Sequence, residues 1–302
     1  MMSFYQKNKN EITTLQLISQ ILGKIKLEYA VQEPQWAHVV LDITSRGFST
    51  GLLKCNTEYF EIETDLSNSL ISISTSADDI IVELADGKSI REYYTEIIDV
   101  AEKLGLNISI NTKPQEMETK VHFEEDDEHH HYNENTANEI LKWFQFAWNA
   151  EQLFIGPLRK RKVYPGLFWG TFDVSCILIY KEHEPFPDDS LVIERAAFDE
   201  HMVEFGFWLG DDNFEHPTLF TLPYPFVEEE ELTVDDSFPQ RSSFSPEMAE
   251  YLYEFKDGMS SSETDNAVQF FEASFRGAAE YLKWKNTEYC RKGLKMRENN
   301  RK

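Results

Sequence analysis

The chain has 302 residues, of which 41% are hydrophobic and 14% aromatic, so it is long enough and apolar enough to bury a substantial core. Its 54 acidic and 29 basic residues give a formal net charge of −25. Such a charge repels phosphate backbones and anionic membrane surfaces. We therefore expect neither nucleic-acid binding nor membrane binding.

The C-terminal residues, unlike the rest of the chain, carry a net positive charge. Residues 283–302 contain eight basic and two acidic side chains. We expect residues 286–302 to form a basic, solubilising tail, with a nucleic-acid arm as the alternative. Cys55, Cys176 and Cys290 lie far apart in the sequence, which argues against a disulfide framework and against a cysteine zinc site. The first residues lack the apolar core of a signal peptide, so a reducing, cytoplasmic location is expected.

Residues 1–114 show a helix, then strands, then a second helix. Apolar residues at helical spacing predict a helix over 12–22 that ends at Gly23. A capping box of Ser89 and Glu92 begins another helix that ends at Gly105. Alternating or briefly apolar runs predict strands at 37–44, 59–66, 70–75, 79–85 and 106–110.

Residues 136–285 show a similar order of elements. Thr136 and Glu139 read as a capping box that opens an aromatic helix, which Gly156 and Pro157 end. A further helix is expected near 263–285, where apolar residues recur every three or four positions. Strands are predicted at 166–180, 202–210 and 218–226.

These elements indicate an α+β fold with two helix-flanked, mostly antiparallel sheets. The expected organisation is an N-terminal half, an acidic connecting segment at 115–135, a C-terminal half and the basic tail. A duplication relating the two halves is an open alternative, although no residue-level repeat supports it.

The connecting segment includes "HFEEDDEHHHY" at 122–132, which holds four of the eight histidines. Imidazole and carboxylate groups are common metal ligands, but the spacing matches no metal motif, and neighbouring side chains on an extended chain point in opposite directions. We therefore expect a polar loop or the edge of a pocket, and assign no metal ligands.

Strand alternation places Asp173 on the same face as Trp169 and Ser175. An aspartate that faces the interior must be hydrogen-bonded or paired, because burial of an unpaired charge is costly. Exposure to water or a role in capping a turn is the alternative.

The chain contains no phosphate-binding glycine loop and no G-x-S-x-G motif, so it lacks the local signatures of nucleotide binding and of α/β-hydrolases.

Four pieces of sequence together resemble the bacterial family catalogued as domain of unknown function 5996: "QWAHVVLDITSRGF", "F-x-x-D-x-x-H-x-x-Y", "FWGTFD" and "GFWLG". The resemblance covers about residues 10–285 and implies no reaction. Asp199, Glu200, His201 and Leu209 depart from the family pattern. The positions that match its motifs are Trp36, His38, Thr44, Arg46, Gly47, Asp126, His129, Tyr132, Trp169, Gly170, Asp173, Phe207 and Trp208.

Two functions follow from these positions. In the first, an aromatic pocket between the two halves binds a small polar or anionic molecule, with walls of Trp36, Trp169 and Trp208. The polar groups that orient this ligand are His38, Arg46, His129 and Asp173, and Arg46 would grip a carboxylate or phosphate.

Chemistry in such a pocket would use His129 as the general acid or base, because the ordinary histidine pKa lies near neutrality. Asp126 or Asp173 would orient His129, and Tyr132 would donate to developing negative charge. Hydrolysis or isomerisation would suit this set, and the sequence identifies no cofactor and no oligomeric state. In the second function these residues are structural, Arg46 pairs with Asp173, and the protein is an interaction module with an acidic surface.

Overall fold

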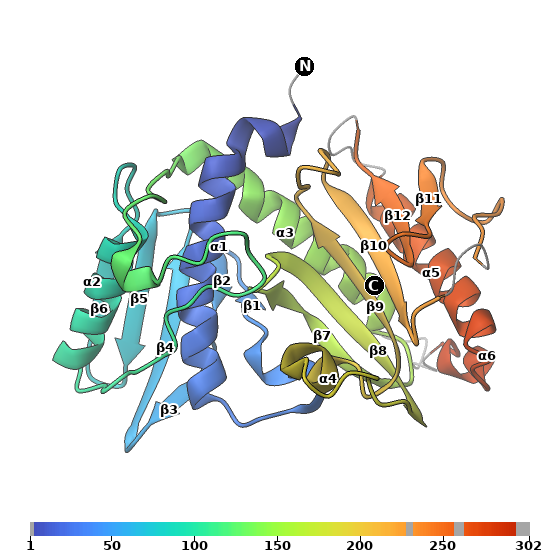
Figure 1. Ribbon diagram of the computed structural model, residues 1–302, viewed down its shortest axis with the longest axis horizontal. Coiled ribbons are helices and arrows are strands. Elements are labelled where there is room, and N and C mark those ends of the chain that lie inside the picture. The colour runs from blue at the N-terminus through green and yellow to red at the C-terminus, as the bar shows by residue number, and fades with distance from the viewer. Residues whose placement is uncertain (1–2, 228–231, 257–262, 294–302) are drawn as a thin grey trace, which may run out of the picture.

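The computed structural model describes residues 3–227, 232–256 and 263–293, and these residues form two antiparallel sheets of six strands each (Figure 1). The α+β fold with two helix-flanked sheets is therefore confirmed. The first sheet has the order β1-β2-β4-β5-β6, with β3 paired to β4. Its strands are β1 (Asp42–Ile43), β2 (Gly47–Ser49), β3 (Leu53–Cys55), β4 (Glu58–Asp65), β5 (Leu70–Thr75) and β6 (Asp79–Glu83).

The second sheet has the order β11-β12-β10-β9-β8-β7. Its strands are β7 (Arg161–Phe168), β8 (Asp173–His183), β9 (Glu200–Trp208), β10 (Thr218–Tyr224), β11 (Ser242–Ser245) and β12 (Glu250–Glu254). The helices are α1 (Phe4–Tyr29), η1 (Pro34–Val39), α2 (Ile90–Lys103), η2 (Phe123–Glu125), α3 (Glu134–Ile155), α4 (Val192–Ala197), α5 (Glu263–Tyr281) and α6 (Thr287–Cys290).

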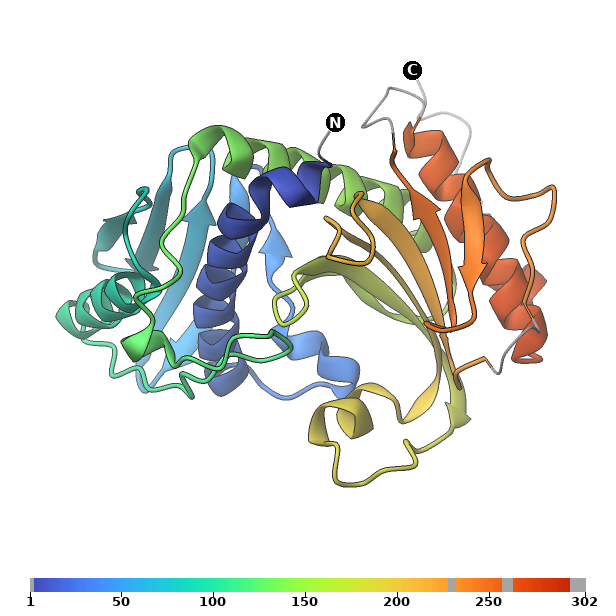
Figure 2. The same ribbon diagram turned by 45° about the horizontal axis from the view of Figure 1, so that its top comes forward.

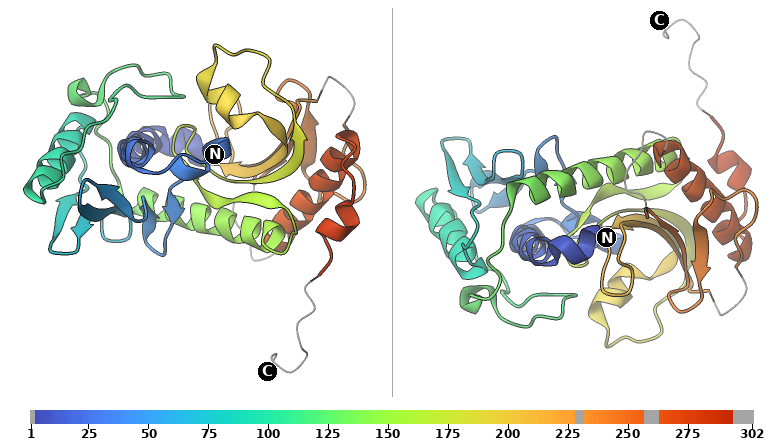
Figure 3. Two further views of the ribbon diagram at one scale, coloured as in Figure 1. Left: turned by 90° about the horizontal axis from the view of Figure 1, so that it is seen from below. Right: turned by 90° about the horizontal axis from the view of Figure 1, so that it is seen from above.

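The second sheet is strongly curved, and its two faces have different partners. Helices α3 and α5 cover the convex face, whereas α4 and its flanking loops lie on the concave side (Figures 2 and 3). Alternation along β9 turns Phe205 and Phe207 toward the helices, where Phe205 packs against Phe154 of α3 and Phe271 of α5. The residues between them, such as Glu204, face the concave side.

Helix α1 lies between the two sheets and joins them (Figure 1). The indole of Trp169, in the turn between β7 and β8, packs directly on Gly23 of α1. The same indole donates a hydrogen bond from Nε1 to the carbonyl of Val39 (3.1 Å), and Leu41 forms a β-bridge with Leu167. These contacts hold the first half against the concave side of the second sheet.

Some predicted elements differ from the structure. Helix α1 is longer than 12–22 and continues through Gly23, where the absence of a side chain makes room for Trp169. Helix α3 is capped by Asn133 rather than Thr136, and it ends at Ile155 as Gly156 and Pro157 predicted. The capping box of Ser89 and Glu92 at α2 is confirmed.

Three predicted strands were wrong. Residues 37–44 contain the second half of η1 and only the short β1, and residues 106–110 form no strand. The apolar run 166–180 is not one strand: it turns at 169–172 and forms the hairpin of β7 and β8. The basic tail is described only as far as Gly293, so most of 286–302 lies outside the described residues. No described helix has both the length and the hydropathy to span a lipid bilayer.

Replacement of Gly23 by alanine tests the contact that joins the halves. At an exposed helical position, replacement of glycine by alanine raises the free energy of unfolding by up to about 1 kcal/mol. Here the added Cβ would overlap the indole of Trp169, and overpacking of this kind costs about 1–3 kcal/mol. We expect a lower free energy of unfolding in urea for Gly23→Ala, and no change for Gly293→Ala, whose Cβ would meet open space. A Gly23→Ala protein as stable as the original would contradict this packing.

Candidate functional site

A cavity of ≈ 320 Å³ lies between α1, η1 and the connecting segment on one side and the concave face of the second sheet on the other. The first half contributes Leu27, Gln35, Trp36, Val39, Gln115 and Glu116. The second half contributes residues of the turn before β8, of β8, β9, β10 and β12, and of the α4 segment. These are Phe168, Trp169, Gly170, Thr171, Asp173, Ile177, Ile193, Glu194, Ala197, Phe198, Met202, Glu204, Phe220, Leu222 and Glu250.

Most of the cavity wall is apolar. Aromatic rings stand on several sides, from Trp36 in η1, Trp169 beside α1 and Phe220 in β10. The indole of Trp36 also ties η1 to α4, because its Nε1 donates to the carbonyl of Ile193 (2.9 Å). The walls are thus built from segments that are distant in sequence and are held together by specific contacts.

Five carboxyl groups line this cavity, and the described residues around it include no lysine, arginine or histidine. Asp173, Glu204 and Glu250 belong to the sheet. Glu116 and Glu194 lie on the opposite wall, in the connecting segment and in α4. The cavity therefore concentrates acidic groups without a basic side chain to balance them.

Asp173 is the most enclosed of the five, with 6% of its surface exposed. The hydroxyls of Thr171 and Ser175 donate hydrogen bonds to it, the latter at 2.5 Å. Ser175 lies on β8 opposite Gly206 of β9, whose missing side chain leaves space for the serine hydroxyl. Of the two orientations left open by the sequence, Asp173 has the inward one, with the hydrogen bonds that its burial requires.

Burial and mutual repulsion keep these acids protonated to a higher pH than usual. Burial raises the pKa of Asp173 well above its ordinary value, and the neighbouring Glu204 adds to the effect. Burial raises the pKa of Glu204 to about 7, although a hydrogen bond with Ser175 acts in the opposite direction. Burial, together with the charge of Asp173, raises the pKa of Glu250 to about 8.

Backbone strain is also concentrated around the cavity. Gln35, Trp36 and Glu116 all line it with positive φ angles of 52°, 55° and 53°, and Phe172, next to Asp173, has a φ of 65°. Residues other than glycine rarely adopt this backbone conformation, which costs on the order of 1 kcal/mol or more for each residue. Such strain is common at functional sites. At Glu116 the strained backbone directs the carboxylate over Gly170, where a side chain would collide with it.

The structure brings three of the predicted site residues together on this cavity: Trp36, Trp169 and Asp173. Trp208 shares the concave sheet face with Glu204, but its ring packs against Phe214 and Phe220, and it does not line the cavity. The prediction that His38, Arg46 and His129 share a pocket with Asp173 is wrong, because none of the three lines the cavity.

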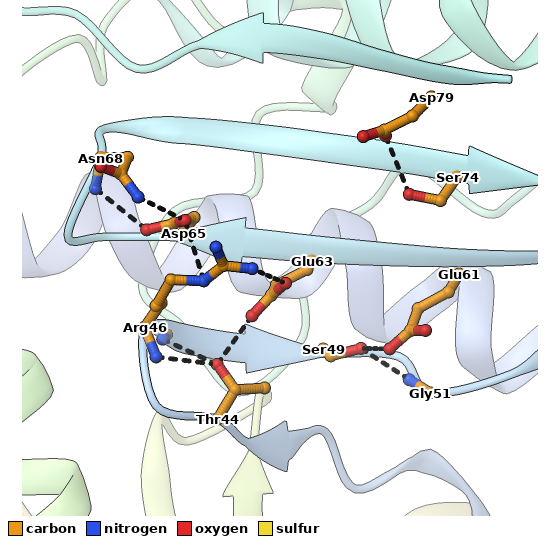
Figure 4. A network of polar contacts seen from close by, with 11 residues as sticks. Thr44, Arg46, Ser49, Gly51, Glu61, Glu63, Asp65, Asn68, Ser74 and Asp79 are labelled. Carbon is orange, nitrogen blue, oxygen red and sulfur yellow. Dashed lines mark hydrogen bonds and ion pairs between the residues drawn. The ribbon is translucent and has the colours of Figure 1, made fainter.

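His38 and Arg46 have local partners instead. His38 is buried in η1, where its Nδ1 accepts a hydrogen bond from the backbone N–H of Glu33. Arg46 is exposed at the β1–β2 turn and forms ion pairs with Glu63 (3.2 Å) and Asp65 (3.1 Å) of β4 (Figure 4). The alternative prediction that Arg46 pairs with Asp173 is therefore also wrong.

Asp126, His129 and Tyr132 lie in the connecting segment and have local partners of their own. Asp126 is fully buried and accepts the backbone N–H of His129, whose Nδ1 lies 2.8 Å from its carboxylate. This contact raises the pKa of His129. The hydroxyl of Tyr132 donates to Ser69 (2.8 Å) in the turn between β4 and β5. These contacts anchor the connecting segment, and a catalytic role for the three residues stays a prediction that the cavity does not support.

The remaining carboxylates of the cavity were missed by sequence analysis. Glu204 alternates with apolar residues along β9, which could have marked it as a concave-face residue beside Asp173. Glu250 belongs to β12, a strand that was not predicted, and Glu116 and Glu194 belong to loop and helix segments without a recognisable motif. No group of three or more histidine, cysteine, aspartate or glutamate side chains in the described part is arranged to hold a metal ion.

Glu250→Gln tests the raised pKa values of the carboxyl groups in this site. Between pH 5 and 8 the folded protein keeps a proton on Glu250 that the unfolded chain releases, so this group lowers the free energy of unfolding as the pH rises. Glutamine has no proton to release. In urea unfolding we expect Glu250→Gln to match the wild type at pH 5 and to be more stable at pH 8.5, by about 1–2 kcal/mol after allowance for solvent screening. The exposed Glu247→Gln should show no such pH-dependent difference, and equal curves for Glu250→Gln and wild type would contradict the assignment.

Comparison with known proteins identifies a family for this chain. A family model described as "Family of unknown function (DUF5996)" matches residues 2–291. No curated protein and no solved structure matches the chain. Because the family model covers nearly the whole chain, the chain belongs to the DUF5996 family of unknown function.

Proposed function

We propose that the cavity binds a small organic cation, an amine or ammonium group attached to an apolar body. The observation that supports this function is the set of five carboxyl groups around an aromatic-walled cavity that has no basic side chain among its described lining residues. A bound cation would balance the negative charge of such a site.

Electrostatics favours this ligand. Carboxyl groups that would repel one another across a cavity remain partly protonated. A positive charge between them allows them to ionise, and the resulting carboxylates then attract the cation. Trp36 and Trp169 line the cavity, and a ring whose face meets a desolvated cation adds cation–π attraction worth about 0.5–2 kcal/mol. The sequence-based expectation of an anionic ligand does not suit this cavity, because Arg46 lies elsewhere.

The shape and polarity of the cavity limit the ligand further. Its ≈ 320 Å³ lies at the small end of the range for ligand sites, roughly 300–1,000 Å³. A sugar would leave many hydroxyl groups against apolar wall without partners, which is costly. The carboxylates do not form a metal-binding group, so a bare metal ion is also a poor fit. An aromatic ring with a short aminoalkyl chain matches both the walls and the charge.

If the bound molecule is also converted, Glu204 is better placed than His129 to transfer the proton. Its pKa of about 7 allows it to give or take a proton at neutral pH, and it faces the cavity beside Asp173. The acid–base chemistry expected from the sequence is thus reassigned, within this proposal, to the paired carboxyl groups of β8 and β9.

Binding of benzylamine, measured by isothermal titration calorimetry at pH 7.5, tests the proposal. We expect saturable binding to the wild-type protein. Glu204→Gln and Asp173→Asn should each weaken it at least tenfold, about 1.4 kcal/mol, because each removes negative charge next to the ammonium. Glu247→Gln, which removes a carboxylate from the exposed β11–β12 turn, is the matched control and should bind benzylamine normally. Absence of binding, or equal affinities in all four proteins, would rule out a cation site in this cavity.

A further inference from the structure

A second recess, of ≈ 410 Å³, lies beside the acidic cavity and has the opposite charge. Lys24 of α1 and Lys113 and Lys120 of the connecting segment line it, and Glu28 is the one acidic residue among its described lining residues. Three lysines gathered in one recess are unusual for a chain with a net charge of −25. The recess is therefore a local site of positive charge on an acidic protein.

Lys24 is the central feature of this recess. It is 3% exposed, and no carboxylate of the described residues forms an ion pair with its ammonium group. Its Nζ donates a hydrogen bond to Oε1 of Gln115 (2.9 Å) and lies 5.8 Å from the ring centroid of Trp169. Burial lowers the pKa of Lys24 to about 8. An enclosed ammonium without a counter-ion is unfavourable, and an anion next to it would relieve this cost.

The lysine recess and the acidic cavity adjoin one another. Leu27 and Gln115 line both of them. Trp169, a wall of the acidic cavity, carries the ammonium of Lys24 over its ring. The backbone of Gln115 is fixed on α1, because its N–H donates to Oε1 of Gln20 and its carbonyl accepts from Nε2 of Gln20. The side chain of Gln115 supplies to Lys24 the oxygen that a ligand oxygen would replace.

We propose that the lysine recess is a second subsite that binds a carboxylate of the same ligand, so that the ligand is a zwitterion with its ammonium group in the acidic cavity. This inference rests on the proposed function for the position of the ammonium group. A single negative charge matches the buried Lys24 ammonium, whereas a doubly charged phosphate would meet stronger repulsion from the neighbouring carboxyl groups. The ligand class is thus an amino acid whose amino and carboxylate groups are separated by an apolar body.

The test compares four related probes by calorimetry on the full-length protein. Benzylamine carries the cation alone and benzoate the anion alone. The zwitterions are 4-(aminomethyl)benzoate and its longer homologue 4-(aminomethyl)phenylacetate. We expect the better of the two zwitterions to bind at least tenfold more tightly than benzylamine. Lys24→Met should remove this advantage while it leaves benzylamine affinity unchanged or higher, because it deletes a positive charge near the cation. Lys103→Met, which removes an exposed lysine at the end of α2, is the control and should keep the advantage.

The outcomes separate this inference from the proposed function. If benzylamine binds but neither zwitterion binds more tightly, or if the advantage survives in Lys24→Met, the carboxylate subsite is wrong and the cation cavity stands. If benzoate binds in a manner that depends on Lys24 while benzylamine does not bind, the carboxylate subsite stands and the cation cavity is wrong. If no probe binds, both are wrong. Should Lys24→Met fail to fold, the exposed Lys120→Met provides the same comparison, with a smaller expected loss of the zwitterion's advantage.

Discussion

Negative charges enclosed in a cavity repel one another, and this constraint governs the candidate site. Asp173, Glu204 and Glu250 project from neighbouring strands into a space whose walls are largely apolar, and the described lining residues include no basic side chain to neutralise them. The acids can avoid the repulsion by keeping their protons, as their raised pKa values indicate, or by accepting a positive charge from a ligand. An acidic cluster without such a ligand lowers stability, which suggests that it serves binding rather than folding.

The fold brings this cluster into existence by closing one half of the chain over the other. The curved second sheet presents its concave face, and α1, η1 and the segment around Glu116 cover that face from the first half. Trp169 on Gly23 is the contact that fixes the distance between them, and Trp36 links η1 to α4 across the cavity. The positive φ angle of Glu116 is further support for a functional cavity. Strained backbone of this kind persists where the surrounding structure holds a side chain in a required position.

Periodicity predicted the α+β fold and most helices, because burial on one face imposes its own repeat on a strand or helix. It failed where local sequence does not decide the outcome. The apolar run around Trp169 reads as one strand, although it contains a tight turn. His129 was expected to act as an acid or base because the ordinary histidine pKa lies near neutrality, yet its contact with Asp126 anchors the connecting segment. Glu250 joined the site only through tertiary structure, which no local pattern records.

We propose that a bound cation neutralises the carboxyl groups of the acidic cavity. The number of protons released or taken up on binding is the direct test of this proposal. A primary amine remains protonated at pH 7, because its ordinary pKa lies well above that, near 10 for lysine. Any proton released when benzylamine binds must therefore come from the protein. Calorimetric titrations in buffers of different ionisation enthalpy measure this number. We expect net proton release at pH 7, smaller in Glu250→Gln than in the wild type, because the carboxyl groups ionise around the ammonium. Binding without proton release, or with proton uptake, would contradict it.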